Sequence, residues 1–94
     1  MFYFYILRCF DNSLYCGVTN NLERREKEHN TSKSKSSRYT RLRRPVKLVY
    51  TEKFQTLQEA MRRERQVKKL EKVKKESLIC DNGNLLKKLS KKEK

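Results

Sequence analysis

The chain has 94 residues and a net charge of +14, because 25 Lys and Arg are set against 11 Asp and Glu. That length allows one domain with a single modest core. The charge exceeds what solubility requires and predicts a polyanionic partner, either nucleic acid or an acidic membrane surface. Basic residues recur along the chain beside tyrosines, which favours nucleic acid, whereas a membrane binder would concentrate its charge on one amphipathic helix.

Composition also argues against membrane-spanning, secreted and metal- or disulfide-stapled proteins. No segment approaches the roughly 18 consecutive apolar residues that a membrane span needs. The apolar start, Met1 to Leu7, lacks the charged region and cleavage site of a signal peptide. The three cysteines, Cys9, Cys16 and Cys80, have neither the spacing of zinc ligands nor the even number of a disulfide framework. We therefore expect reduced thiols, a cytoplasmic location and no membrane partner.

The first two elements form a predicted β-hairpin. Residues 2–9 are rich in aromatic and branched side chains, 11–13 form a turn cluster, and 14–18 are typical of a second strand. A three-residue loop would place position 9 opposite 15 and position 5 opposite 19. Because side chains alternate along a strand, one face of the hairpin then carries Tyr5, Leu7, Tyr15 and Gly17.

A helix, a loop and a third strand follow. Asn20 and Glu23 have the spacing of an N-cap and its returning acid, which predicts a helix from about Asn21 to His29. Residues 31–37 lack periodicity and predict a mobile loop, and a short helical turn over 38–44 is stopped by Pro45. Residues 46–54 alternate in character, which predicts a strand with one face made by Val46, Leu48 and Tyr50.

The last third of the chain is predicted to be helical. Thr56 and Glu59 form a capping box that opens a helix through about Leu70, and a short helix is expected over 72–79. The fold class is therefore α+β, with a small three-stranded mixed or antiparallel sheet flanked by helices in the order β-β-α-β-α-α. We expect one domain over residues 1–80 and a basic, flexible tail over 81–94. Helical spacing groups a stripe of Leu57, Ala60, Met61, Glu64, Val67 and Leu70.

Four features of this pattern suit chemistry on a phosphate. The hairpin pairs Tyr5 with Tyr15, and Arg25 and His29 share one helix face because they are four residues apart. Glu64 lies on an otherwise apolar stripe, where a carboxylate is costly to bury unless it is paired or metal-bound. Sites that cleave phosphodiesters combine a group that activates water, a cation on the phosphate and a fixed positive charge. The fourth feature is a basic run without acids: Lys33, Lys35, Arg38, Arg41, Arg43, Arg44 and Lys47.

Each of these features also has an ordinary structural interpretation. Tyrosines on strands are usually packing residues, a histidine at a helix end commonly caps carbonyl groups, and an arginine on a helix is most often solvated. For Glu64 the alternative is a salt bridge to another element, and for the basic run it is a solvated loop. No single residue decides between these interpretations, so the combination of their spacings has to be weighed.

Taken together, the segments resemble the GIY-YIG nuclease superfamily over roughly residues 2–79. Tyr5 stands at the tyrosine of the first motif, and Tyr15 and Gly17 stand at the outer residues of the second. Arg25 follows Tyr15 by ten residues and His29 follows by four more, as in the family. The later segments resemble the small standalone bacterial subfamily and the structure-selective nuclease subunit that works with a scaffold partner. The resemblance rests on Tyr3-Phe4-Tyr5-Ile6-Leu7, Leu14-Tyr15-Cys16-Gly17, Asn21-Leu22-Glu23-Arg24-Arg25-Glu26-Lys27-Glu28-His29-Asn30, Arg43-Arg44-Pro45-Val46-Lys47-Leu48-Val49-Tyr50 and Glu59-Ala60-Met61-Arg62-Arg63-Glu64.

The resemblance implies a role for each matching residue. Tyr5 would act as general base or water-positioning group, and Tyr15 would bond the scissile phosphate. Arg25 would stabilise the pentacovalent charge, and His29 would orient or assist a tyrosine hydroxyl. Glu64 would hold a single Mg²⁺ or Mn²⁺, expected only with substrate. The sequence departs from the family in lacking a glycine before the first tyrosine and in carrying a cysteine in the middle of the second motif, but neither change removes a reactive side chain.

The expected function is a metal-dependent endonuclease that hydrolyses phosphodiester bonds of DNA, in repair or recombination. Phosphate contacts that do not depend on base sequence are expected from the basic run and from Lys68. DNA is preferred to RNA as the partner, and a monomer is the expected state. Two alternatives stay open, a non-catalytic nucleic-acid-binding module and a subunit that cuts only with a protein partner that supplies targeting.

Overall fold

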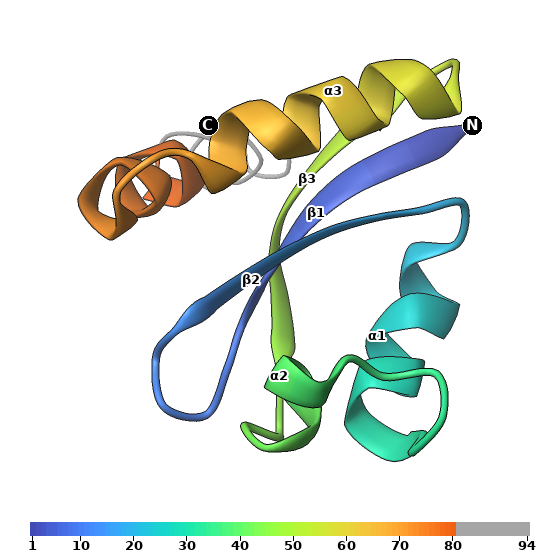
Figure 1. The fold of residues 1–94 in the computed structure, drawn as a ribbon, viewed down its shortest axis with the longest axis vertical. Helices are drawn as coiled ribbons and strands as arrows, with labels where there is room; N and C mark the ends of the chain where they lie inside the picture. Colours follow the sequence, from blue (N-terminus) through green and yellow to red (C-terminus); the bar gives the residue numbers. More distant parts are fainter. Residues whose placement is uncertain (81–94) are drawn as a thin grey trace, which may run out of the picture.

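The computed structural model describes residues 1–80, in which three antiparallel strands lie between two groups of helices (Figure 1). The strands are β1 (Phe2–Arg8), β2 (Leu14–Thr19) and β3 (Lys47–Phe54), and their order in the sheet is β2-β1-β3. The α+β class and the predicted order of strands and helices are confirmed, and the sheet is antiparallel throughout. The tail predicted over 81–94 lies outside the described residues.

The hairpin between β1 and β2 has a longer loop than the sequence predicted. Tyr5 pairs with Gly17 and Leu7 with Tyr15, so the predicted pairing of position 5 with 19 is wrong by two residues. The amide of Cys9 donates to the Ser13 carbonyl, which closes a five-residue loop. Asn12 in this loop has a φ of 71°, a conformation that Asn tolerates better than most residues. A shift of two residues preserves side-chain alternation, so the predicted shared face is retained.

The alternation predicted for β3 is interrupted by a bulge. Ile6 of β1 pairs with Tyr50, but the next residue, Leu7, pairs with Leu48, so one extra residue of β3 lies between them. A bulge of this kind moves the following side chains to the opposite face. Leu48 therefore packs with Leu7 while Tyr50 packs with Ile6, and the prediction that Leu48 and Tyr50 share a face is wrong.

Three helices and one further helical segment complete the described chain. α1 (Leu22–Thr31) begins at the cap residue Asn21, one position later than predicted, and the Asn21 side chain accepts a hydrogen bond from the Arg24 amide. α2 (Arg38–Arg41) is the short helical turn predicted before Pro45. α3 (Leu57–Lys68) opens with the predicted capping box of Thr56 and Glu59, in which both reciprocal hydrogen bonds are present. Residues 72–80 are also helical.

Each face of the sheet carries its own apolar cluster. One comprises Phe4, Ile6, Cys16, Tyr50, Val67 and Ile79, and is covered by α3 and the helical segment that follows it. Figure 1 places α1 and α2 on the other side of the strands. The second cluster lies there and comprises Tyr5, Leu7, Cys9 and Val46. Complete burial of an Ile or Phe side chain stabilises a fold by roughly 1.5–3 kcal/mol, so β1, which supplies both clusters, organises the domain.

The apolar stripe predicted for α3 is narrower than the sequence suggested. Ala60 and Val67 are fully buried, whereas Leu57 and Met61 are 45% and 41% exposed. A helix turns by about 100° per residue, so residues 60 and 67 point almost the same way while 61 points sideways. Glu64 lies between these directions and is half-buried. No helix within residues 1–80 is long and apolar enough to cross a membrane.

Candidate active site

The centre of the candidate site is Tyr5, in the middle of the central strand. Its side chain is 2% exposed and lies over Gly17, its partner on β2. A Cβ atom at position 17 would lie 2.3 Å from the Tyr5 hydroxyl oxygen and 2.4 Å from Cζ. Only glycine leaves room for the ring there, so the second motif's glycine fixes where the Tyr5 hydroxyl lies.

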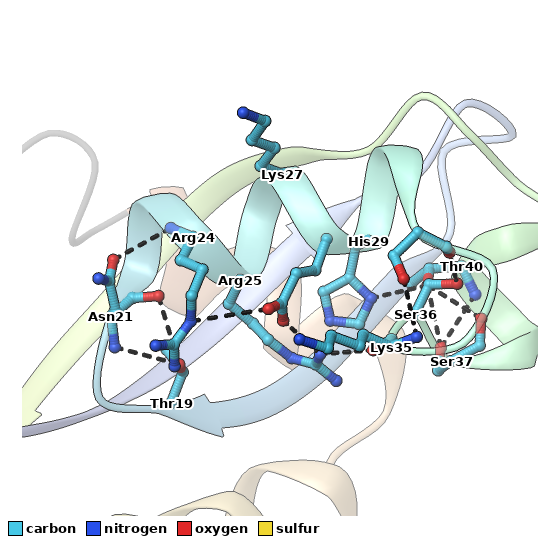
Figure 2. Close-up of polar contacts among 12 residues, drawn as sticks. Thr19, Asn21, Arg24, Arg25, Lys27, His29, Lys35, Ser36, Ser37 and Thr40 are labelled. Carbon is cyan, nitrogen blue, oxygen red and sulfur yellow. Dashed lines mark hydrogen bonds and ion pairs between the residues drawn. The ribbon is translucent and has the colours of Figure 1, made fainter.

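His29, in the last turn of α1, lies within hydrogen-bond distance of this hydroxyl. The Tyr5 hydroxyl oxygen lies 3.0 Å from His29 Nε2, and His29 Nδ1 lies 2.8 Å from Thr40 Oγ1 of α2. His29 and Thr40 are both fully buried, so the imidazole does not cap the helix as its ordinary interpretation suggested. Figure 2 shows His29 directed from α1 toward Ser37 and Thr40.

The hydrogen-bond network favours one arrangement of the protons around His29. Thr40 Oγ1 lies 3.2 Å from the Ser37 carbonyl oxygen, which can only accept, and 3.0 Å from Ser37 Oγ, which can donate or accept. When Thr40 donates to Ser37, its oxygen accepts a proton from His29 Nδ1–H. In this tautomer His29 Nε2 has a free lone pair, and the Tyr5 hydroxyl donates to it.

Both members of the pair are neutral at physiological pH. Burial raises the pKa of Tyr5 to about 12, although the neighbouring Arg25 opposes that rise. Burial, with the charge of Arg25, lowers the pKa of His29 to about 4. The resting site thus contains a neutral phenol donating to a neutral imidazole, and not a tyrosinate or an imidazolium.

Arg25 lies on the same side of α1 as His29. Its guanidinium donates to Glu28 Oε1 at 2.9 Å and to the Lys35 carbonyl oxygen at 2.5 Å. Figure 2 shows its side chain running along α1 toward Lys35, whereas Lys27 projects from the opposite side. Its charge also acts on Tyr5, and its side chain keeps 26% exposure. Arg25 therefore places a fixed positive charge beside the buried hydroxyl, within reach of solvent.

Tyr15 joins the site through a row of ring contacts. Its ring lies 5.2 Å from that of His29 and 5.9 Å from that of Tyr39, with which it is stacked at an interplanar angle of 26°. The Arg43 guanidinium carbon lies 3.9 Å from the Tyr39 ring centroid, and Arg43 Nε bonds Asp11 at 3.0 Å. Contacts on both sides of its ring fix the orientation of Tyr15.

Glu64 approaches the same region from α3. Its negative charge is among those that raise the pKa of Tyr5 and of Cys16, so the predicted metal ligand and the predicted catalytic tyrosine share one electrostatic environment. Within residues 1–80 its carboxylate pairs with Lys68 of the same helix at 3.1 Å, and with no other element. Within residues 1–80 no group of three His, Cys, Asp or Glu side chains could hold a metal. A lone half-buried carboxylate fits Mg²⁺ or Mn²⁺, which take few protein ligands and keep several waters.

The comparison with known proteins decides the family. Residues 1–77 match the family described as the GIY-YIG catalytic domain. The chain belongs to the GIY-YIG family.

Similar proteins from several bacteria carry the name UPF0213. A UPF0213 protein of Clostridium perfringens is 53% identical over 83 residues, covering 88% of this chain and 87% of that protein. The UPF0213 protein YazA of Bacillus subtilis is 46% identical over 82 residues, covering 87% and 81% of the two chains. A solution structure of a UPF0213 protein from Bacillus halodurans is 42% identical, covers 97% of this chain and 96% of that one, and superposes with a TM-score of 0.58. Small standalone GIY-YIG proteins are thus the relatives, and the fold is of the nuclease type.

Two arginines of the basic run, Arg41 and Arg44, bind backbone carbonyl groups of the fold. Arg44 donates to the carbonyl oxygens of His29, at 2.7 Å, and of Ser32, so it satisfies the C-terminal end of α1. Arg41 donates to the Lys33 carbonyl at 2.9 Å. Guanidinium groups therefore tie the segment predicted as a mobile loop to its neighbours. Their partners are carbonyl oxygens, which every residue carries, so the sequence offered no acidic side chain that would have indicated these contacts.

Other members of the run have free side chains. Within the described residues, no hydrogen bond or ion pair engages the side chains of Lys33, Arg38 or Lys47, and all three are exposed. These cations are available to a phosphate backbone. Thr40 and Ser37 were missed by the sequence analysis, although their three-residue spacing at a helix start is typical of a cap.

Proposed function

We propose that this GIY-YIG protein is a metal-dependent endonuclease that hydrolyses phosphodiester bonds of DNA. One observation carries the proposal. The buried Tyr5 hydroxyl is bonded to a neutral His29 whose other nitrogen is occupied, with the fixed charge of Arg25 and the carboxylate of Glu64 nearby. A structural tyrosine needs no such surroundings, whereas an acid–base relay does.

The relay moves one proton in each of two hydrogen bonds. A water molecule at the Tyr5 oxygen attacks phosphorus and gives its proton to that oxygen, while the Tyr5 hydroxyl proton passes to His29 Nε2. The new P–O bond forms as the bond to the leaving oxygen breaks, and the leaving oxygen takes its proton from solvent. The phenol therefore stays neutral, which its raised pKa requires. His29 holds the proton at Nε2 and returns it after product release.

The charged residues stabilise the phosphate as the reaction proceeds. Arg25 offers its guanidinium to the charge that develops on the non-bridging oxygens, and Tyr15 donates its hydroxyl to one of them. Glu64 would hold Mg²⁺ or Mn²⁺, which would polarise the phosphate and stabilise charge on the leaving oxygen. Lys33, Arg38 and Lys47 bind flanking phosphates without reading bases.

A second candidate, a nucleic-acid-binding module without turnover, is favoured by the resting protonation of the site. A Tyr5 pKa of about 12 leaves no tyrosinate to act as a base at neutral pH. Such a module would keep the basic surface and use the site only to hold a phosphate. A subunit that cuts only with a targeting partner would behave in the same way when tested alone.

Cleavage assays with matched variants separate these candidates. Linear duplex, single-stranded, flap and branched DNA, together with structured RNA, are incubated with Mg²⁺ or Mn²⁺. Tyr5→Phe and Glu64→Gln should abolish nicking and preserve binding, while the controls Tyr3→Phe and Glu71→Gln should cleave as the wild type does. Binding by every variant with cleavage by none, including the wild type, would instead support the binding module or the partner-dependent subunit.

A further inference from the structure

Lys68 lies beside Glu64, the α3 carboxylate whose charge acts on Tyr5. Its ammonium nitrogen lies 3.1 Å from Glu64 Oε2, on the next turn of the helix. The same ammonium acts electrostatically on Tyr15 and Cys16 of β2, so it lies on the side of α3 that meets the site. From the sequence, Lys68 was expected only to contact phosphates of the nucleic-acid backbone.

A metal ion and the Lys68 ammonium would repel each other if both were bound to the Glu64 carboxylate. A divalent cation on Glu64 would lie within a few ångströms of a unit positive charge, where repulsion is strong in a partly dehydrated site. The Glu64 side chain is 20% exposed, so its charge is poorly screened when Lys68 leaves. The Lys68 side chain is 54% exposed, and its flexible stem can carry the ammonium elsewhere.

We propose that Lys68 is the resting counter-ion of Glu64 and transfers to the scissile phosphate when a divalent cation takes the carboxylate. This inference rests on the proposed function, because it deepens the account of that same site. The exchange makes metal and substrate bind cooperatively: phosphate draws Lys68 away from Glu64, and the freed carboxylate attracts the metal. Lys68 then becomes a phosphate ligand within the site.

The ordinary alternative is a surface pair that only supports the helix. Glu and Lys four residues apart, in this order, commonly stabilise a helix by a few tenths of a kcal/mol. Such a pair would also repel a metal ion on Glu64, but it would leave DNA affinity unresponsive to changes at Glu64. The two interpretations therefore differ in measurements that require no cleavage.

The first test is Mn²⁺ binding to the protein without DNA, followed by paramagnetic broadening of the Cys16 backbone amide. Lys68→Met should bind Mn²⁺ about two- to fivefold more tightly than the wild type, the range that loss of such a pair allows. Lys69→Met removes the same charge from the same helix end and should leave Mn²⁺ affinity nearer that of the wild type. Equal affinities for Lys68→Met and Lys69→Met would overturn the exchange.

The second test is DNA affinity in EDTA at fixed salt, as a double-mutant cycle. Glu64→Gln should tighten binding about two- to fivefold, because it frees Lys68 for phosphate. Lys68→Met should change affinity less than twofold in the wild type but should remove that gain in the Glu64→Gln background. The control Glu71→Gln raises the net charge equally, and tightening of equal size there would overturn the exchange.

Failure of the inference and failure of the proposed function give different results. Cleavage that needs Tyr5 and Glu64, without coupling between Glu64 and Lys68, would overturn the exchange alone. Coupling with no cleavage on any substrate would support the exchange of Lys68, and it would favour the binding module or the partner-dependent subunit over an endonuclease that acts alone. Broadening at Cys16 that persists in Glu64→Gln would remove Glu64 as the metal ligand, and the exchange with it.

Discussion

Gly17 and Tyr5 face each other across β1 and β2 so closely that a Cβ atom on residue 17 would overlap the Tyr5 phenol. The ring is rigid and its Cζ is among the overlapped atoms, so a small shift at the hydroxyl cannot relieve the contact. The hydrogen bond to His29 depends on this packing. The glycine of the second motif therefore acts on the first motif's tyrosine through space.

We predict that Gly17→Ala moves the Tyr5 hydroxyl away from His29 and abolishes cleavage. Overpacking of this kind should also lower the free energy of unfolding by about 1–3 kcal/mol. Urea unfolding measures the stability, and the nicking assay measures the activity at a temperature where the variant is folded. In the double variant Gly17→Ala with Tyr5→Phe, removal of the hydroxyl should recover part of the stability without restoring cleavage. Full activity in Gly17→Ala would contradict this packing role.

The protonation of His29 can be measured directly, because it is the only histidine in the chain. Its imidazole resonances should titrate with a pKa of about 4, well below the ordinary 6.5, because of burial and of Arg25. Nitrogen shifts should identify the tautomer with the proton on Nδ1. A midpoint near 6.5 would mean that the imidazole is hydrated and not held by Tyr5 and Thr40.

The same shift predicts how stability depends on pH. Because the folded pKa of His29 lies below the unfolded value, the unfolded chain binds the proton more tightly. The stabilisation is therefore complete above about pH 6.5 and is lost as pH falls toward 4, with a slope of up to about 1.4 kcal/mol per pH unit. Urea unfolding of the wild type and of His29→Gln at intervals from pH 7 to 4.5 tests this slope, which should be absent in the variant.

Much of the fold followed from local sequence patterns. Capping residues predicted α1 and α3 to within one or two positions at their starts, because an N-cap depends on its own next three residues. The hairpin register and the bulge in β3 did not follow, because each depends on packing between distant segments. Leu48 and Tyr50 alternate in sequence, and only the pairing of β3 with β1 separates them.

The residues of the candidate site were proposed from the spacing of the family's motifs, but the contacts between them were not. Tyr5 and His29 are 24 positions apart, and nothing local indicates that they are bonded. Thr40 could not be placed, because its contact with His29 requires the turn at α2. Lys68 was predicted only as a phosphate contact, because one sequence cannot show which of many lysines faces a carboxylate.

Arg8 and Glu76 anchor the helical segment 72–80 to the end of β1. Arg8 Nη1 and Nη2 donate to the two carboxylate oxygens at 2.8 and 2.7 Å, and Lys72 donates to one of them at 2.9 Å. The hydrogen bonds from Arg8, and then from Lys72, lower the pKa of Glu76 to about 2. The folded pKa lies below the unfolded one, so the stabilisation is present above about pH 4.3 and is lost as pH falls toward 2.

We therefore predict that Glu76→Gln lowers stability at pH 7 by about 1 kcal/mol or less, since the pair is partly solvated. The difference from the wild type should shrink as pH falls from 4.3 toward 2. Urea midpoints of both proteins at pH 7, 4 and 3 measure it. Glu71→Gln, at an exposed acid nearby, provides the control and should show no such convergence.

The basic run should divide into structural and binding residues when each arginine is replaced. Arg44→Ala removes hydrogen bonds to the carbonyl oxygens at the end of α1, so we expect a loss of about 1–3 kcal/mol in the free energy of unfolding. Arg38 makes no such contact within residues 1–80, so Arg38→Ala should leave stability unchanged within about 0.5 kcal/mol.

DNA binding should show the opposite division. Arg38→Ala should weaken binding for every sequence tested and reduce the slope of log K against log salt by about 0.9, because one phosphate contact is lost. Arg44→Ala, measured where it is folded, should keep the wild-type slope because its guanidinium is already engaged by backbone oxygens. Fluorescence anisotropy with one labelled duplex across a salt series measures both slopes. If Arg44→Ala reduced the slope as much as Arg38→Ala, Arg44 would have to leave its carbonyl partners to bind phosphate, and the division of the basic run would be wrong.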